Sequence, residues 1–202
     1  QAWKKNGHKQ IIGFPHSSVR YWDLRYFYDS RSYIKSTNCN LPIPDKVACN
    51  GEYVKKMYSF GNFPKNKLFK VESLRYLYLF NKKKKFIKEN KMDNFTLLVL
   101  GDYLLSNTHK QLEILDKAVP FFKKKIKIIF KPHPACNIDT RHFLNLKIRK
   151  KFTKLDVLLR NSDLVYTSST TMAAVDAFYS NLPVITLLDG NILNLSPIRD
   201  KS

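Results

Sequence analysis

Cysteine and glycine are both scarce in this sequence. Only three cysteines occur in 202 residues, and none of them forms a CxxC pair. We therefore expect free thiols and a reducing compartment instead of a disulfide framework. The six glycines form neither a G-x-G-x-x-G fingerprint nor a Walker loop, which argues against dinucleotide dehydrogenases and P-loop enzymes. Clusters with metal-ligand spacing are absent too, so we expect no metal site.

Long apolar runs are also missing. The longest, such as residues 97–100 and 184–188, are far shorter than the roughly 20 residues that a membrane-spanning helix needs. The sequence begins Gln-Ala-Trp-Lys-Lys, with neither an initiator Met nor the apolar region of a signal peptide. We therefore expect a cytoplasmic protein whose native N-terminus lies upstream, so that this chain is a fragment.

Acidic residues are outnumbered. Lys and Arg total 36 against 16 Asp and Glu, a net charge of +20, which could attract nucleic acid, anionic lipid or an acidic glycan. One hypothesis is a nucleic-acid-binding module in which residues 82–85 (KKKK) contact phosphates and residues 21–28 (YWDLRYFY) stack on bases. A short lysine run is more often a solvated face. We therefore expect no nucleic-acid partner and, as an option, peripheral contact with the anionic inner face of a membrane.

The apolar residues that are present predict an α/β fold. They make up 44% of the chain, ample for a core. In the second half, predicted strands and helices alternate, which is typical of a Rossmann-like parallel sheet with crossover helices. The predicted strands are residues 95–100, 126–130, 163–166 and 184–188. The predicted helices are residues 108–122, where Thr108 and Gln111 have capping-box spacing, 155–160 and 172–180.

The first half repeats the same pattern less clearly. Residues 11–14 and 46–49 are predicted strands, each followed by a polar loop, and helices are predicted from about residue 52 to 59 and over residues 72–80. We interpret residues 1–80 as the C-terminal part of a preceding α/β domain. Residues 81–94, rich in lysine and without apolar periodicity, are the predicted linker to a Rossmann-like domain over residues 95–202.

Candidate site residues follow the predicted strands, because ligands of open parallel sheets bind beyond the carboxyl ends of the strands. Hydroxyls at residues 168–171, next to the free N–H groups of a predicted helix start, favour an anion such as phosphate. The alternative is that one of them merely caps the helix. Lys131 and His133, in a loop stiffened by two prolines, would add a cation and an imidazole at a neighbouring strand end. Together they predict a nucleotide-phosphate site.

These residues resemble the C-terminal domain of a GT-B glycosyltransferase. The similarity lies in residues 130–134 (FKPHP), residues 168–171 (SSTT) some 35 residues later, residues 173–177 (AAVDA) and residues 182–185 (LPVI). It is nearest to bacterial surface-polysaccharide enzymes of the sialyltransferase and Kdo-transferase types, which share an HP motif and a later Ser-rich motif. Relatives tend to carry Gly at the position of Asn181, and Asn also tolerates the left-handed conformation of a helix cap.

The resemblance implies transfer of a sugar, either a nonulosonic acid or Kdo, from a CMP-sugar to a glycan or lipid-linked acceptor of a surface polysaccharide or lipopolysaccharide. It implies no metal and no cofactor besides the nucleotide-sugar donor. Residues 1–80 would be acceptor-side and residues 95–202 a truncated donor-binding domain. The residues expected at the donor are Gly101, Lys131, His133, Pro134, Ser168, Ser169, Thr170 and Thr171.

The catalytic base stays open. In the family it usually lies in the N-terminal domain, and the acidic pair and Gly motif of bacterial sialyltransferases are not present here. His16 and Glu52, which follow predicted strands, are the candidates, and a base outside this chain is the alternative. A CDP-glycerol-type polyol-phosphate transferase and a UDP-sugar 2-epimerase also remain open, because they share the architecture and fold alone does not separate them.

Overall fold

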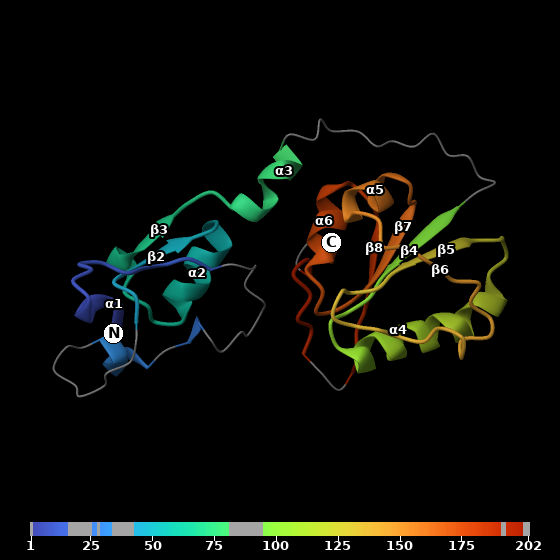
Figure 1. Cartoon of the computed structure of the whole chain (residues 1–202), viewed down its shortest axis with the longest axis horizontal. Helices are drawn as coiled ribbons and strands as arrows, with labels where there is room; N and C mark the ends of the chain where they lie inside the picture. Colours follow the sequence, from blue (N-terminus) through green and yellow to red (C-terminus); the bar gives the residue numbers. More distant parts are fainter. Residues whose placement is uncertain are drawn as a thin grey trace. The chain divides into compact units, whose positions relative to one another are not determined.

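The chain forms two compact units, residues 1–81 and 82–202, in a computed structural model (Figure 1). The structure describes residues 2–15, 26–27, 29–33, 43–80, 95–190 and 193–199. Both units are α/β structures built on all-parallel sheets, which confirms the predicted fold class. The expected linker, residues 81–94, lies outside the described part. Of the helices described, none has both the length and the apolar character needed to cross a bilayer.

The first unit contains a three-stranded sheet in the order β1-β2-β3. Its strands are β1 (Ile12–Gly13), β2 (Lys46–Cys49) and β3 (Leu68–Lys70). Its helical segments are α1 (Ala2–Lys5), η2 (Ser30–Tyr33), α2 (Glu52–Phe60), η3 (Lys65–Lys67), η4 (Leu74–Tyr76) and α3 (Leu77–Phe80). The core of this unit joins the central strand to α2 and consists of Tyr26, Val47, Cys49, Val54, Phe63 and Leu68.

The second unit contains a five-stranded sheet in the order β6-β5-β4-β7-β8. Its strands are β4 (Thr96–Leu100), β5 (Lys127–Lys131), β6 (Arg149–Lys150), β7 (Leu164–Ser168) and β8 (Val184–Leu187). Its helices are α4 (Leu105–Ala118), η6 (Val119–Phe121), α5 (Leu155–Arg160) and α6 (Ala173–Tyr179). Four of these strands were predicted. The fifth, β6, is two exposed basic residues long and has no hydrophobic signal.

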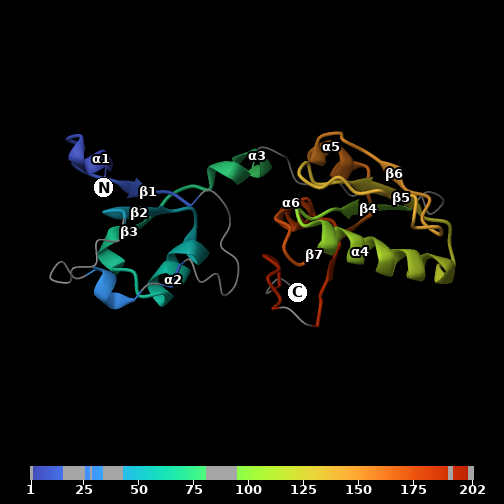
Figure 2. The same ribbon diagram turned by 60° about the horizontal axis from the view of Figure 1, so that its bottom comes forward.

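Helices cover both faces of the second sheet. Alternate residues of β4 point to opposite faces, so Val99 packs with Leu112 and Leu115 of α4, whereas Leu98 packs with Leu158 of α5. All five side chains of β4 are buried, as expected for the central strand of a parallel sheet. Figure 2 shows α4 and α5 on opposite sides of the strands. The unit is therefore a three-layer, doubly wound α/β structure.

An irregular segment replaces the crossover helix between β5 and β6. Residues 132–148 contain no helix, yet four of their apolar side chains complete the core on the α4 face, namely Cys136, Ile138, Phe143 and Leu146. The Asp116 carboxylate of α4 accepts hydrogen bonds from the N–H groups of Asn145 at 2.8 Å and Leu146 at 3.1 Å. This stretch has no helical periodicity in the sequence, but it fills the place where a helix would pack.

Candidate functional site

The candidate site lies where the strand order of the second sheet reverses. From β4 the chain continues to β5 on one side and later returns to β7 on the other. Leu100, the last residue of β4, pairs with Lys131 of β5 and Thr167 of β7, so the loops after all three strands leave the same carboxyl edge. In doubly wound folds this switch point is where ligands bind.

A buried carboxylate joins two of these loops. Asp102, two residues after the end of β4, is 1% exposed, and its Oδ2 accepts hydrogen bonds from the hydroxyls of Ser168 at the end of β7 and Thr170 beyond it. Its Oδ1 accepts the N–H of Leu104 at 3.0 Å. Ser168 and Thr170 are buried as well. Two of the four hydroxyls expected at the nucleotide-sugar donor, those of Ser168 and Thr170, therefore donate to Asp102 and fix the loop after β7 to the loop after β4.

The start of α4 differs from the prediction. Thr108 is not an N-cap, because α4 begins three residues earlier, at Leu105. The Thr108 hydroxyl is fully buried; it accepts the N–H of Asp102 at 2.9 Å and donates to its carbonyl at 3.1 Å. Gln111 donates from Nε2 to the Tyr166 carbonyl on β7 at 3.1 Å. The capping-box interpretation of Thr108 and Gln111 was wrong, since Thr108 anchors α4 to the loop after β4 and Gln111 anchors it to β7.

The hydrogen bonds keep Asp102 ionised. Burial alone would raise the pKa of this carboxyl, but the Leu104 N–H and the side chains of Ser168, Thr170 and Asn107 outweigh burial and lower the pKa below its ordinary value. A charged Asp102 repels an anion placed directly against it. An anion bound at this edge would therefore have to contact other groups of the loops.

This lowered pKa predicts an acid-dependent loss of stability. Ionised Asp102 stabilises the folded chain above its unfolded pKa of about 3.9, and this contribution disappears as the pH falls through the lower folded value. The variant Asp102→Asn lacks it at every pH. We expect the difference in free energy of unfolding between the wild type and Asp102→Asn, measured by urea denaturation, to shrink as the pH is lowered from about 5 to below the folded pKa. A difference that stays constant over this pH range would contradict the lowered pKa of Asp102.

The loop after β5 presents His133 at the same edge. Its Nδ1 accepts the N–H of Ala135 at 3.2 Å, so in the neutral imidazole the proton resides on Nε2, which can donate to a ligand. The half-exposed Tyr103 ring lies edge-on to it, with centroids 6.4 Å apart. A Cβ on Gly101 would stand 3.2 Å from the Phe130 ring and 3.4 Å from the backbone nitrogen of His133. A glycine at position 101 thus lets the two loops approach.

Lys131 and the hydroxyl-rich loop are not immediate neighbours. Because β4 lies between β5 and β7, the two loops are separated by two strand spacings, about 10 Å. The expectation of neighbouring strand ends was wrong in this respect. The Lys131 ammonium donates to the Thr153 carbonyl at 2.8 Å, on the β6 side. A ligand that contacts both loops must pass over Gly101 and Asp102.

The other residues expected at the nucleotide-sugar donor lie in different environments. Ser169 is buried, Pro134 is exposed and Thr171 is half-buried. The Thr171 hydroxyl accepts the N–H of Ala173 at 3.4 Å. Beyond β8, Asp189 forms an ion pair with Lys110 of α4, which links that helix to the far end of the same edge.

The two candidate bases belong to the first unit. Glu52 begins α2 just after β2, and its exposed carboxylate lies 4.0 Å from the Lys70 ammonium of β3. His16 lies outside the described residues. The side-chain amide of Asn50 donates to the Pro15 carbonyl at 3.2 Å, which ties the ends of β1 and β2 together. Within the part of the chain that the structure describes, no three His, Cys, Asp or Glu side chains gather as metal ligands would.

No family model and no curated protein matches the sequence. Among solved structures, HepE of Anabaena in complex with UDP and glucose matches with a TM-score of 0.48 and 11% identity, over 88% of this chain and 52% of HepE. HepE in complex with UDP-glucose gives 0.47 and 11%, over 88% and 53%. This chain spans about half the length of HepE. At these TM-scores the fold assignment rests on the strand order of the two sheets.

Proposed function

We propose that this chain is part of a GT-B glycosyltransferase that transfers a sugar from a nucleotide-sugar donor to a glycan or lipid-linked acceptor. One observation carries the proposal: the polar loops after β4, β5 and β7 leave one carboxyl edge at the switch point of a doubly wound sheet. The resemblance of residues 130–134 and 168–171 to donor-binding motifs supports the same edge as the donor site.

The proposed roles follow from the hydrogen bonds already in place. Nε2 of His133 donates to the donor phosphate, because Nδ1 is occupied by a backbone N–H. Lys131 contributes positive charge, and the exposed Tyr103 ring next to His133 offers a surface for the sugar or base. Ser169 and Thr171, together with backbone N–H groups, contact the ligand from the other side. Fixed donors of this kind stabilise a departing phosphate without a metal ion, so no cofactor besides the donor is proposed.

Ser168 and Thr170 act on the ligand indirectly in this proposal. Their hydroxyls donate to Asp102, so they set the shape of the loop that meets the donor. Asp102 is correspondingly a positioning residue. The catalytic base is proposed to be Glu52 or His16 in the first unit, or a group outside this chain.

The proposed donor is a CMP-sugar that carries a nonulosonic acid or Kdo, and the proposed acceptor is a surface polysaccharide or lipopolysaccharide. Both rest on the motif resemblance. HepE binds UDP-glucose, and a UDP-sugar 2-epimerase or a CDP-glycerol-type transferase would use UDP or CDP. The identity of the nucleotide therefore separates the candidates.

A thermal-shift panel of CMP, CDP, UDP and GDP on the full chain tests the proposal. A nucleotide present at about 100 times its Kd stabilises the folded state by about 2.7 kcal/mol, a rise in Tm of several degrees for a chain of this size. We expect the largest rise with CMP and at least a tenfold weaker affinity for CMP in His133→Ala. The matched control is His142→Ala, another loop histidine, whose exposed ring lies 3.8 Å from Asp139.

The outcomes separate the candidates. A preference for UDP would contradict the CMP-sugar donor and favour the UDP-sugar 2-epimerase. A preference for CDP would favour the CDP-glycerol-type transferase. No response to any nucleotide, or equal losses in His133→Ala and His142→Ala, would contradict a nucleotide site at this edge.

A further inference from the structure

A second surface feature lies at the opposite, amino edge of the second sheet. Phe121, at the end of η6, is 85% exposed, and Leu144, in the segment between β5 and β6, is 87% exposed. Phe95 and Phe122 at the same edge are partly exposed. Exposure of large apolar side chains to water is unfavourable, and transfer of these side chains to another apolar phase is favourable.

Several contacts bring these side chains to one corner of the unit. Asn145, next to Leu144, donates its N–H to Asp116 in the last turn of α4, just before η6. The Lys127 N–H donates to the Phe95 carbonyl at 2.9 Å, which marks the amino edge of β4 and β5. Phe121 and Leu144 therefore both flank the C-terminal end of α4. We name the surface of Phe121, Phe122, Leu144 and the lysines around them the amino-edge corner.

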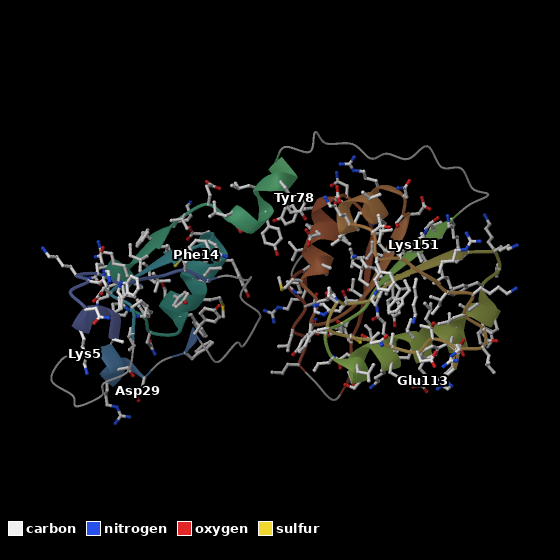
Figure 3. The ribbon with its side chains drawn as sticks, in the orientation of Figure 1. Lys5, Phe14, Asp29, Tyr78, Glu113 and Lys151 are labelled. Atoms are coloured by element: carbon white, nitrogen blue, oxygen red, sulfur yellow. The ribbon has the colours of Figure 1, made fainter. Side chains whose placement is uncertain are left out.

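Exposed lysines lie next to these apolar side chains along the chain. The lysines of the amino-edge corner are all exposed and are Lys123, Lys124, Lys125, Lys127 and Lys147. The nearby carboxylates are engaged within the protein. Glu113, on the outer side of α4 (Figure 3), forms an ion pair with Lys117 at 2.8 Å, and Asp116 accepts backbone N–H groups. The corner thus combines protruding apolar tips with positive charge.

We propose that the amino-edge corner binds the surface of a bilayer that contains anionic lipid. Phe121 and Leu144 insert at the boundary between headgroups and acyl chains, and the lysines attract the anionic headgroups. The charge complementarity and the exposed apolar tips carry the proposal, which is independent of sugar transfer. It assigns the peripheral membrane contact to named residues and leaves the carboxyl edge of the sheet open.

Lipid fits the amino-edge corner better than nucleic acid does. Single-stranded nucleic acid is held by aromatic rings on which bases stack. Phe121 offers a ring to a base, but Leu144, the most exposed large apolar side chain among the described residues, has none. Insertion of an aliphatic side chain into the acyl region of a membrane is favourable instead.

Co-sedimentation with vesicles tests the proposal. The full chain is incubated with vesicles of phosphatidylcholine alone, or of phosphatidylcholine and phosphatidylglycerol in equal parts. We expect binding to the anionic vesicles only, weakened by added salt. The double variant Phe121→Ser with Leu144→Ser should bind at least about tenfold more weakly, and Lys123→Glu with Lys125→Glu should lose about tenfold or more. An unchanged Tm confirms that these exposed substitutions leave the fold intact.

Two matched controls locate the surface. Phe152→Ser removes a ring that is 80% exposed. It follows Lys151 (Figure 3), whose N–H donates to the Phe130 carbonyl near the carboxyl end of β5, and its loss should leave binding unchanged. Lys56→Glu with Lys65→Glu changes the net charge equally in the first unit and should weaken binding far less. Equal losses in the corner variants and these controls, no binding by the wild type, or equal binding to neutral vesicles would overturn the proposal. So would complete displacement from vesicles by an oligonucleotide, which would indicate a nucleic-acid surface.

Discussion

Asp102→Ala is expected to lower the free energy of unfolding of the second unit by about 3 kcal/mol or more. The substitution removes the acceptor of the Leu104 N–H and of the Ser168 and Thr170 hydroxyls. The two buried hydroxyls and the partly buried Leu104 N–H then lack this acceptor, and a buried donor left unsatisfied costs about 1–3 kcal/mol. The loops after β4 and β7 lose their shared anchor.

Chemical denaturation combined with hydrogen exchange measures this effect in the second unit separately from the first. Asp102→Asn keeps the size of the side chain and one acceptor oxygen, so we expect a smaller loss than for alanine. Asp139→Asn is the control, because that carboxylate is exposed and pairs with the exposed Arg141; its variant should unfold at the wild-type midpoint. If Asp102→Ala unfolds like Asp139→Asn, the carboxylate does not hold the two loops together.

Gly61→Ala is expected to destabilise the first unit by about 3 kcal/mol or more. A Cβ at this position would lie 1.9 Å from the carbonyl oxygen of Tyr26 and 2.8 Å from its carbonyl carbon. These are backbone atoms, so no side-chain rotation relieves the overlap. The backbone around Tyr26 must move away from the end of α2, and the buried Tyr26 ring, which meets Tyr58 edge-on, must move with it.

The test of this prediction is hydrogen exchange over α2 and β2. We expect protection to fall there in Gly61→Ala while the second unit keeps its exchange rates. Gly190→Ala makes the same chemical change where no atom lies within 4 Å of the added Cβ, and it should leave exchange unchanged. Wild-type protection in Gly61→Ala would mean that the chain at Tyr26 does not approach α2 this closely.

Sequence patterns predicted the second unit well because its central strands are buried on both faces. Residues 95–100 and 126–130 are short apolar runs, and they correspond to β4 and β5 with shifts of one residue. The predicted helix over residues 155–160 is α5. Asn181 adopts φ 58°, which confirms the left-handed conformation expected there. These features depend on local burial or on a single residue's backbone preference, so they can be read from short segments.

Elements without such signals were not predicted, or their structure differs from the prediction. Strand β3, with only Leu68 buried, and strand β6 are recognised by their pairing partners rather than by composition. The helix predicted over residues 72–80 is instead a 3₁₀ turn followed by the four-residue α3. Of the aromatic segment at residues 21–28, the structure describes Tyr26 and Phe27, and Tyr26 is buried in the core of the first unit.

The sequence predicted the location of the site better than the contacts between its side chains. Strand ends located the loops, but the sequence does not say in which direction a hydroxyl donates. Asp102 was not among the residues expected at the site, whereas the structure makes it the common acceptor of Ser168 and Thr170. A useful signal would have been an Asp two residues after a buried strand with a Thr six residues later, since the Thr108 hydroxyl bonds the backbone of Asp102.

The position of β4 at the centre of its sheet has a consequence for protein synthesis. Leu97 pairs with Ile128, which emerges from the ribosome soon afterwards, but on its other side it pairs with Leu164, which is translated much later. Until β7 has been made, one flank of β4 stays unpaired, and unpaired strand edges bind other chains. We expect nascent chains stalled between β6 and β7 to recruit chaperones, and chains extended past β8 to be released from them.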